Sequence, residues 1–266
     1  MDNRHKSAKQ ARIVAGVRTG KSKKRQDKAT TQPRITDYIK KPNGETPVVH
    51  KKVDLNKVKF KQLNNNKREV SMDELNKLCS SQKQFICLGH EPNTRLGALV
   101  GINKRHIKIH SLQGKPRAYI FTSANLHIWP MPSLTNEDVA TALFDTHDPK
   151  VGKLILCSFY WDITYKDIPE MFVKVTEFAK RNGYILITSS DTNSHSTLWN
   201  CIADNARGKK LEELMIQADL IPVNVGNKKT FHGNNGSSII DVTMVTTRFA
   251  DRIKNWQVSN RNMLCY

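Results

Sequence analysis

Acidic and amide side chains stand at the ends of predicted strands in this sequence. They are, in chain order, Asn64, Glu91, Asp191 and Asn193, and Asp241 lies within a further predicted strand. Ligands of layered α/β folds bind at strand ends, and a hard divalent cation prefers carboxylate and amide oxygens. The pattern therefore predicts a Mg2+ site, with Mn2+ as the alternative ion. Taken singly, most of these residues fit a solvated loop better, but a carboxylate inside an apolar run, such as Asp241, must be paired or functional.

The elements that must position these residues begin after residue 52, where apolar runs alternate with amphipathic helices, as in a layered α/β or α+β domain. Strands are predicted at residues 58–64, 84–89, 117–122, 139–144, 153–160, 184–189 and 238–246. Ser71 and Glu74 form a capping box that predicts a short helix. Apolar residues at a 3.6-residue period predict two more, at Ile168, Met171, Phe172, Val175, Phe178 and Ala179, and at Leu211, Leu214, Met215 and Ala218. Residues 230–238 predict a hairpin.

Residues 1–52 have a different character. They contain Lys and Arg clusters and few large apolar residues, so they cannot bury enough surface to offset the entropy cost of ordering. We expect a disordered basic arm at residues 1–52, ahead of a folded domain at residues 53–266. Such an arm suits non-specific phosphate binding or a nuclear localisation signal, and we expect a nuclear protein.

A short motif within the arm, Gln32, Ile35 and Tyr38, resembles the clamp-binding peptide of DNA replication and repair proteins. Ile39 stands where that peptide has its second aromatic residue. Chance is the stronger interpretation of so short a pattern, and a sliding clamp is retained as an alternative partner.

The composition narrows the class of protein. The 43 Lys and Arg against 24 Asp and Glu give a formal net charge of +19, which attracts polyanions, although a basic solubilising surface explains it equally well. The five cysteines are odd in number and form no CxxC pair, which predicts reduced, buried thiols and argues against a zinc ribbon. The sequence begins without a secretory signal and has no apolar run of about 18 residues, so we expect a protein that is neither exported nor membrane-bound.

Six ordered motifs carry a resemblance to a known family. They are Gln62-Leu-Asn64, Gly89-His-Glu91-Pro92, Ser158-Phe-Tyr160-Trp-Asp162, Ser190-Asp191-Thr-Asn193-Ser-His195, Asn205-Ala-Arg-Gly208 and Ser238-Ile-Ile-Asp241-Val-Thr243. In this order they resemble the endonuclease domain of non-LTR retrotransposons, in the endonuclease/exonuclease/phosphatase superfamily. The resemblance spans residues 53–266 and implies an α+β fold, an α/β sandwich of two packed mixed β-sheets flanked by helices.

The resemblance also implies roles for single residues. Glu91 would be the principal metal ligand, helped by Asn64, while Asp191 and Asn193 would position and activate the attacking water. Tyr160 would contact the scissile phosphate, and Asp241 would orient a catalytic histidine. For His195, a phosphate contact and a structural role in its loop both stay open, and for Arg207 a helix-start role is favoured over DNA contact.

Two departures from the family pattern bear on activity. His90 stands before Glu91 where the family usually has Gln, which removes an expected hydrogen bond near the metal. The family also closes its site with a Ser-Asp-His motif one strand after Asp241, and residues 256–266 contain no such motif. Losing one catalytic group commonly costs about 10²- to 10⁴-fold in rate, so we expect impaired activity, as in a fragment or a decayed copy.

Three functions remain open at this point. The first is a magnesium-dependent phosphodiester hydrolase, an endonuclease that nicks duplex DNA for reverse transcription. The second is a catalytically silent DNA-binding remnant of the same fold. The third, a phosphatase of the superfamily acting on a small substrate, is disfavoured by the net charge. We expect a monomer in each case.

Overall fold

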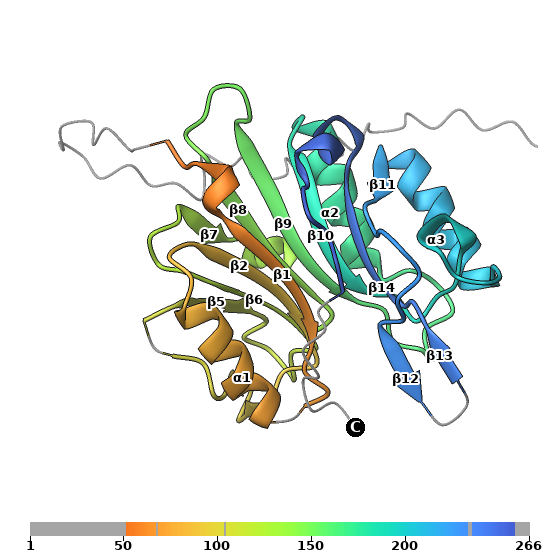
Figure 1. Ribbon diagram of the computed structural model, residues 1–266, viewed down its shortest axis with the longest axis horizontal. Helices are drawn as coiled ribbons and strands as arrows, with labels where there is room; N and C mark the ends of the chain where they lie inside the picture. The colour runs from red at the N-terminus through yellow and green to blue at the C-terminus, as the bar shows by residue number, and fades with distance from the viewer. Residues whose placement is uncertain (1–51, 68, 104, 234–235, 259–266) are drawn as a thin grey trace, which may run out of the picture. The chain divides into compact units, whose positions relative to one another are not determined.

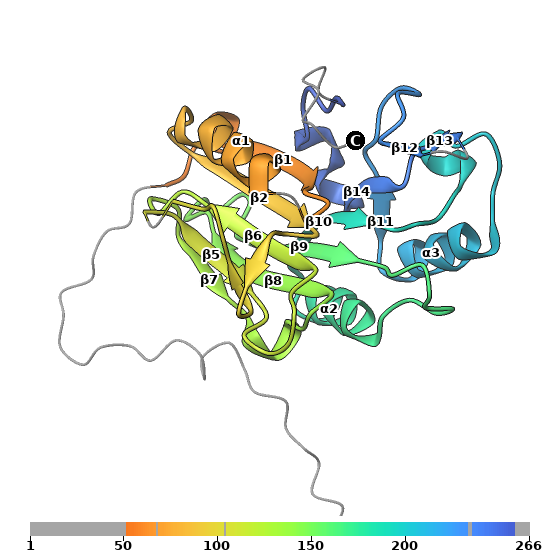
Figure 2. The same ribbon diagram turned by 90° about the horizontal axis from the view of Figure 1, so that it is seen from below.

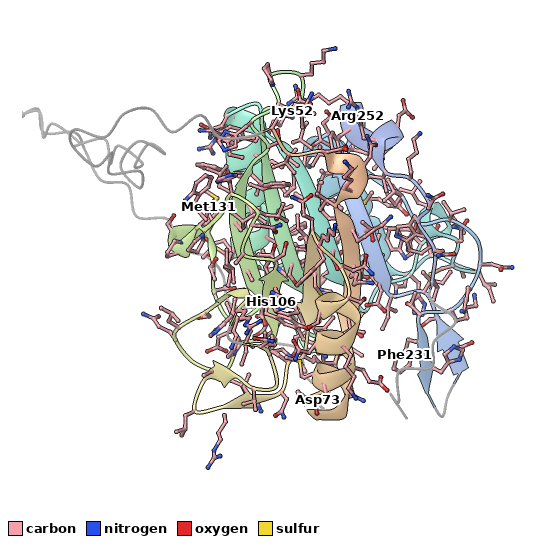
Figure 3. The ribbon with its side chains drawn as sticks, turned by 60° about the vertical axis from the view of Figure 1, so that its left-hand side comes forward. Lys52, Asp73, His106, Met131, Phe231 and Arg252 are labelled. Carbon is pink, nitrogen blue, oxygen red and sulfur yellow. The ribbon has the colours of Figure 1, made fainter. Side chains whose placement is uncertain are left out.

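The computed structural model describes residues 52–67, 69–103, 105–233 and 236–258, and it contains two stacked β-sheets (Figures 1 and 3). The four-stranded sheet has the order β1 (Lys59–Asn64), β2 (Phe85–His90), β6 (Ala118–Thr122) and β5 (Ile107–His110). The six-stranded sheet has the order β11 (Leu220–Pro222), β14 (Asp241–Thr246), β10 (Ile185–Asp191), β9 (Lys153–Tyr160), β8 (Val139–Asp145) and β7 (Ile128–Pro130).

Short strand pairs and helices complete these elements. The pairs are β3 (Thr94–Arg95) with β4 (Ala98–Leu99), and β12 (Phe231–Gly233) with β13 (Gly236–Ser238). The α-helices are α1 (Glu69–Ser80), α2 (Glu170–Arg181) and α3 (Ala206–Gln217). Short 3-10 helices are η2 (Leu55–Lys57), η3 (Pro132–Leu134), η4 (Thr197–Trp199) and η5 (Thr247–Arg252).

The sheets are mixed because two of their strand pairs are parallel. Strand β1 pairs with β2, and β9 with β10, in parallel, and a parallel pair needs a long crossover, which α1 and α2 supply. Helix α1 covers the outer side of one sheet, and α2 and α3 cover the outer side of the other (Figure 2). The predicted sandwich of two mixed sheets flanked by helices is therefore confirmed.

Strands in the middle of this arrangement are buried on both faces, which explains their continuous apolar sequences. In β2, Ile86 and Leu88 enter the core between the sheets, whereas Phe85 and Cys87 pack with α1 residues such as Met72. In β9, Leu154 and Leu156 face the same inter-sheet core, and Phe159 stacks on Phe172 of α2 with ring centroids 4.0 Å apart. The side-chain period of two thus assigns one face of each strand to the sandwich interior.

The predicted strands are observed with small changes in their ends, and two local predictions were wrong. Helix α1 begins at Glu69, so Ser71 lies inside its first turn and is not the residue that caps it. Strand β14 begins at Asp241, because Ser238 still pairs with Phe231 in the β12–β13 hairpin. Asp241 therefore opens its strand and does not stand within it.

The predictions for the arm lie outside the described residues, including the basic segment at residues 1–51 and the clamp-like Gln32, Ile35 and Tyr38. The cysteines of the described part are free thiols, and Cys79, Cys87 and Cys157 are buried, as expected. None of the helices in the described part combines the length and the apolar character needed to cross a membrane.

Candidate active site

The candidate site forms where the inward-facing positions of five strands change from apolar to polar. The apolar part of this inward face includes Ile86, Leu88, Leu154, Leu156, Ile185, Ile187 and Val245. Continuing the alternation along each strand gives polar inward positions at Gln62, Asn64, His90, Ser158, Tyr160, Ser189, Asp191, Asp241 and Thr243. The register agrees, since Asp191 pairs with Tyr160 on one side and with Asp241 on the other.

The amide of Asn64 joins the two sheets at this edge. Its Nδ2 donates to Oδ2 of Asp191 at 2.7 Å and to Oε2 of Glu91 at 3.1 Å. The two carboxylate oxygens can therefore lie no farther apart than the sum of these distances, close enough for one hydrated Mg2+ to link them. The Asn64 Oδ1 accepts from the backbone N–H of Asn66 at 2.8 Å, which fixes the orientation of the amide.

Glu91 sits on a constrained backbone directly after β2. Its φ of +46° lies in the left-handed region, which costs a residue with a side chain roughly 1–3 kcal/mol and is found mainly at functional sites. The Glu91 N–H donates to the carbonyl of Arg117 at 2.7 Å, and its carbonyl accepts from Lys67 N–H at 2.8 Å. Neighbouring backbone thus holds the Glu91 carboxylate at the edge of the sandwich.

The acids of the site are electrostatically strained. Burial, then the charge of Asp241, and also that of Glu91, raise the pKa of Asp191 well above its usual range, while the hydrogen bond from Asn64 opposes this shift. Burial also raises the pKa of Asp241, against hydrogen bonds from Thr230 and Gln62. The second oxygen of Asp191, Oδ1, is buried and accepts no hydrogen bond in the described structure. An unsatisfied buried carboxylate oxygen among like charges fits a cation or a proton.

These oxygen donors therefore fit a divalent cation, although the protein itself supplies few ligands for it. Among the described residues, no group of three or more His, Cys, Asp or Glu side chains is arranged to hold a metal. Glu91 provides a carboxylate, whereas the Asn64 oxygen accepts from the Asn66 N–H and would bind an ion only after the amide turns. Mg2+ usually completes a small set of protein ligands with water and substrate phosphate oxygens.

Gln62 and His90 connect the sheets beneath the acids. Gln62 Nε2 donates to the carbonyl of Ser190 at 3.1 Å and approaches Asp241 Oδ1 at 3.4 Å, while its Oε1 accepts from Thr243 Oγ1 at 2.8 Å. The His90 ring lies 3.2 Å from the carbonyl of Ser189, so its Nε2 must carry the proton. Burial lowers the pKa of His90 to about 4. His90 is thus a neutral, buried connector that cannot reach a substrate.

The loop that follows β10 carries Asn193 and His195. Asn193 has a φ of +44° and donates from Nδ2 to the carbonyl of Trp161 at 3.1 Å. His195 is held through its backbone, because its N–H donates to Asn205 Oδ1 at 3.1 Å and its carbonyl accepts from Asn205 N–H at 3.0 Å. The ring of His195 makes no hydrogen bond in the described structure, so both roles proposed for it stay open.

Arg207 fastens this loop to the one that follows β9. Its guanidinium donates to the carbonyls of Trp161, Asp162, Tyr165 and Thr192 at 2.6 to 3.2 Å, and it lies 3.8 Å from the ring centroid of Trp161. With both terminal nitrogens donating to backbone carbonyls in this way, Arg207 has the structural role favoured from its sequence motif. The motif also serves α3, because the Asn205 side chain accepts from Gly208 N–H at 2.7 Å as an N-cap.

Arg117 is a site-edge residue that the sequence did not indicate. It forms a paired contact with Asp138, at 2.5 and 2.7 Å, and a further ion pair with Asp162. Its guanidinium also lies 5.3 Å from the ring centroid of Tyr160. Burial, together with the charges of Glu91 and Asp191, raises the pKa of Tyr160, so its hydroxyl stays protonated and able to donate. The only local signal for Arg117 was a cation at the start of a buried strand.

No histidine contacts Asp241 in the part of the chain that is described. The side chain of Asn224 donates to the Asp241 carbonyl at 2.9 Å, and Thr230 Oγ1 accepts from the Asp241 N–H at 3.2 Å. The stretch compared with the Ser-Asp-His motif, residues 256–266, is described only as far as residue 258, where Trp256 Nε1 donates to Thr243 Oγ1 at 3.0 Å.

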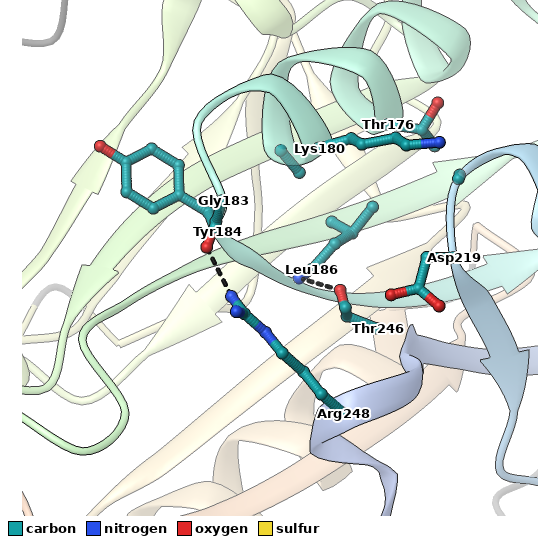
Figure 4. A pocket seen from close by; sticks show the side chains of 10 residues that line it. Thr176, Lys180, Gly183, Tyr184, Leu186, Asp219, Thr246 and Arg248 are labelled. Atoms are coloured by element: carbon teal, nitrogen blue, oxygen red, sulfur yellow. Dashed lines mark hydrogen bonds between the residues drawn. The ribbon is translucent and has the colours of Figure 1, made fainter.

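A separate pocket of about 210 Å3 lies at the opposite end of β10 (Figure 4). Lys180 and Arg248 line it, but each donates at 2.5 Å to a backbone carbonyl, of Gln217 and Gly183 respectively. Leu186 marks the position of this pocket on β10, several residues from Asp191. The pocket is distinct from the candidate site.

Comparisons with known proteins agree with this fold. A family model described as endonuclease-reverse transcriptase matches residues 154–265. The endonuclease domain of TRAS1, a telomere-specific non-LTR retrotransposon, superposes with a TM-score of 0.62 at 24% identity, covering 74% of this chain and 89% of that chain. The catalytic domain of Xenopus laevis APE2 gives a TM-score of 0.50 at 11% identity, covering 71% and 82%. No curated protein matches the sequence.

The sandwich of two mixed sheets has the same fold as these two solved structures. The chain is thus similar to the endonuclease-reverse transcriptase family over residues 154–265, and in its fold to the endonuclease domain of TRAS1, which agrees with the resemblance carried by its six sequence motifs.

Proposed function

We propose that this chain carries a metal-dependent DNA endonuclease domain of a non-LTR retrotransposon, which hydrolyses a phosphodiester and so nicks target DNA for reverse transcription. The supporting observation is the Asn64 amide, which joins Glu91 and Asp191 at 3.1 and 2.7 Å. Three residues distant in sequence thus form one cluster at the open edge of the sandwich.

Glu91 would hold the ion, for which Mg2+ is the first choice and Mn2+ the second. Asn64 would join it through Oδ1 once the amide turns away from its contact with the Asn66 N–H. When bound there, the ion would neutralise charge on the scissile phosphate.

The protein's own residues supply the remaining chemistry. The raised pKa of Asp191 makes it a better base than a free carboxylate, and its unsatisfied Oδ1 can accept a hydrogen bond from the attacking water. Tyr160 keeps its proton and Asn193 carries an amide, so both can donate to phosphate oxygens as negative charge develops. Asp241 would position the group that protonates the leaving oxygen.

A catalytically silent DNA-binding remnant is the second candidate, and one observation favours it. Within the described residues, the Asp241 side chain has Gln62 and Thr230 as hydrogen-bond partners and no imidazole. Without an acid for the leaving oxygen, the phosphate would bind but turn over slowly.

The expectations for location and partners complete the proposal. Duplex DNA is the proposed substrate, because the net charge of +19 attracts polyanions. The basic arm at residues 1–52, a nuclear location, a sliding clamp at Gln32, Ile35 and Tyr38, and a monomeric state stay predictions.

A plasmid-nicking assay with Mg2+ or with chelator tests the proposal. Nicking that needs Mg2+ and is lost in Asp191→Asn, but kept in the exposed control Asp251→Asn, would support an endonuclease. Binding of Mn2+, followed by electron paramagnetic resonance, should be weakened in Glu91→Gln. Metal and DNA binding without nicking would favour the silent remnant, and Mn2+ binding that does not depend on Glu91 would contradict the proposed metal-dependent endonuclease.

A further inference from the structure

A basic groove adjoins the candidate site on the side of Glu91. It has a volume of about 370 Å3 and is lined by Lys67, Glu91, Pro92, Lys115, Pro116, Arg117, Glu137 and Tyr165. Of its cations, Arg117 is paired with Asp138 and Asp162, whereas Lys115 makes no ion pair in the described structure. Lys67 pairs with Glu91 at 3.1 Å. The groove therefore holds cations that differ in their freedom to bind an anion.

The backbone aims Lys67 at Glu91. Asn66 and Lys67 have φ values of +46° and +58°, so consecutive residues with side chains adopt the left-handed conformation. Hydrogen bonds hold them there, because Asn65 N–H donates to the carbonyl of His90 at 2.9 Å and Lys67 N–H to that of Glu91 at 2.8 Å. The Lys67 side chain is about half exposed, but the Lys67 backbone from which it extends is held by these hydrogen bonds to the end of β2.

Both oxygens of Glu91 are occupied in this arrangement. Oε2 accepts from Asn64 at 3.1 Å, and Oε1 takes the ammonium of Lys67 at 3.1 Å. A divalent cation at Glu91 would compete with that ammonium for the carboxylate and would repel it at short range. The ion and the Lys67–Glu91 pair are therefore alternatives.

We propose that Lys67 exchanges partners, leaving Glu91 when a divalent ion binds there and joining Lys115 on a backbone phosphate of the substrate strand in the groove. This inference rests on the proposed function, since it takes Glu91 as the metal ligand. Once Lys67 leaves Glu91, its ammonium needs another anionic partner. A phosphate of the substrate strand beside Lys115 would provide one, because phosphate oxygens bind the compact charge of a Lys ammonium. Metal binding and nucleic-acid binding then strengthen one another through a single side chain.

The exchange predicts opposite effects of one substitution on the two ligands. Lys67→Gln removes the competitor of the ion, so its affinity for Mn2+ should rise by about 2- to 5-fold, the usual worth of a partly exposed ion pair. It also removes one phosphate contact. With Ca2+ present, the negative slope of log affinity for duplex DNA against log salt should therefore become shallower by about 0.9. In chelator, where Lys67 stays on Glu91, that slope should match the wild type.

Full-length variants with matched charge loss isolate the effect. Mn2+ binding is measured by electron paramagnetic resonance and DNA binding by fluorescence anisotropy, with the duplex checked for cleavage afterwards. Lys115→Gln should lower the DNA salt slope with and without Ca2+ and leave Mn2+ affinity unchanged. Lys57→Gln, an exposed control paired with Asp54 at 3.3 Å, should leave Mn2+ affinity unchanged, and its DNA salt slope should differ between Ca2+ and chelator by the same amount as that of the wild type.

The outcomes separate the inference from the proposed function. If Mn2+ binding depends on Glu91 but Lys67→Gln leaves it unchanged, or if Lys67→Gln lowers the DNA salt slope equally with Ca2+ and with chelator, the partner exchange is wrong while the endonuclease proposal stands. If Mn2+ binding does not depend on Glu91, both are overturned. A rise in Mn2+ affinity together with a Ca2+-dependent loss of slope supports the exchange.

Discussion

Replacing Asn64 with Asp tests whether this one amide holds the acids of the site together. The Asn64 Nδ2 donates to Glu91 and Asp191 at 3.1 and 2.7 Å, and an Asp of the same shape turns that donor into a third acceptor. Three carboxylates at such spacing repel one another strongly, so the folded protein should hold one additional proton.

The cost of that proton sets the magnitude of the effect. Keeping a carboxyl with an unperturbed pKa of about 4 protonated at pH 7 costs about 4 kcal/mol, at 1.36 kcal/mol per pH unit. The unfolded chain releases this proton above about pH 4, whereas the folded chain keeps it, so stability falls as the pH rises. Asn64→Asp should therefore lose about 1.4 kcal/mol more than the wild type for each unit between roughly pH 4 and pH 7.

Urea unfolding of the wild type, Asn64→Asp and Asn64→Ala at pH 5, 6, 7 and 8 measures this difference. Asn64→Ala also loses both hydrogen bonds, about 1.5–3 kcal/mol each, but adds no charge, so its deficit should vary little with pH. Mg2+ should restore more stability to Asn64→Asp than to the wild type, because it neutralises the same charges. If Asn64→Asp and Asn64→Ala show the same pH dependence, the carboxylates are not as close as the amide contacts require.

Three further substitutions test other contacts of the site. Arg207→Met leaves four backbone carbonyls without their donor and should cost about 3–5 kcal/mol, lowering the melting temperature by roughly 10 °C, whereas Arg181→Met on the exposed face of α2 should change it little. Gly208→Ala places a methyl carbon 1.9 Å from the carbonyl oxygen of His195, so urea unfolding should show a loss of about 1–3 kcal/mol, and an unchanged midpoint would contradict the close packing of this loop on α3. Asp241→Asn removes a carboxyl whose pKa burial raises to about 6. It should stabilise the protein at pH 7 by about 3 kcal/mol and flatten the rise in stability on acidification, and an unaltered pH profile would show that Asp241 is not desolvated.

The sequence by itself determined most of the longer strands and the place of the candidate site residues along them. Apolar runs such as that of β2 can be recognised in the sequence because a strand buried on both faces has apolar residues at nearly every position. Strand β9 was predicted with its observed ends. Asn64, Glu91 and Asp191 could be singled out because polar residues at strand ends interrupt those runs. Turn and cap details were less secure, as Ser71 shows, because a capping box does not exclude an earlier helix start.

Only the tertiary structure decided which side chains meet at the edge of the sandwich. Gln62 reaches Ser190 and Thr243, and His90 reaches Ser189, across more than 90 residues of sequence. Arg117 and Arg207 are likewise defined by partners from other loops. No periodicity encodes these contacts, since each depends on how two sheets stack and how their loops close. For the same reason the neutral state of His90 and the raised pKa values of Asp191 and Asp241 follow from burial and neighbouring charge, which exist only once the chain has folded.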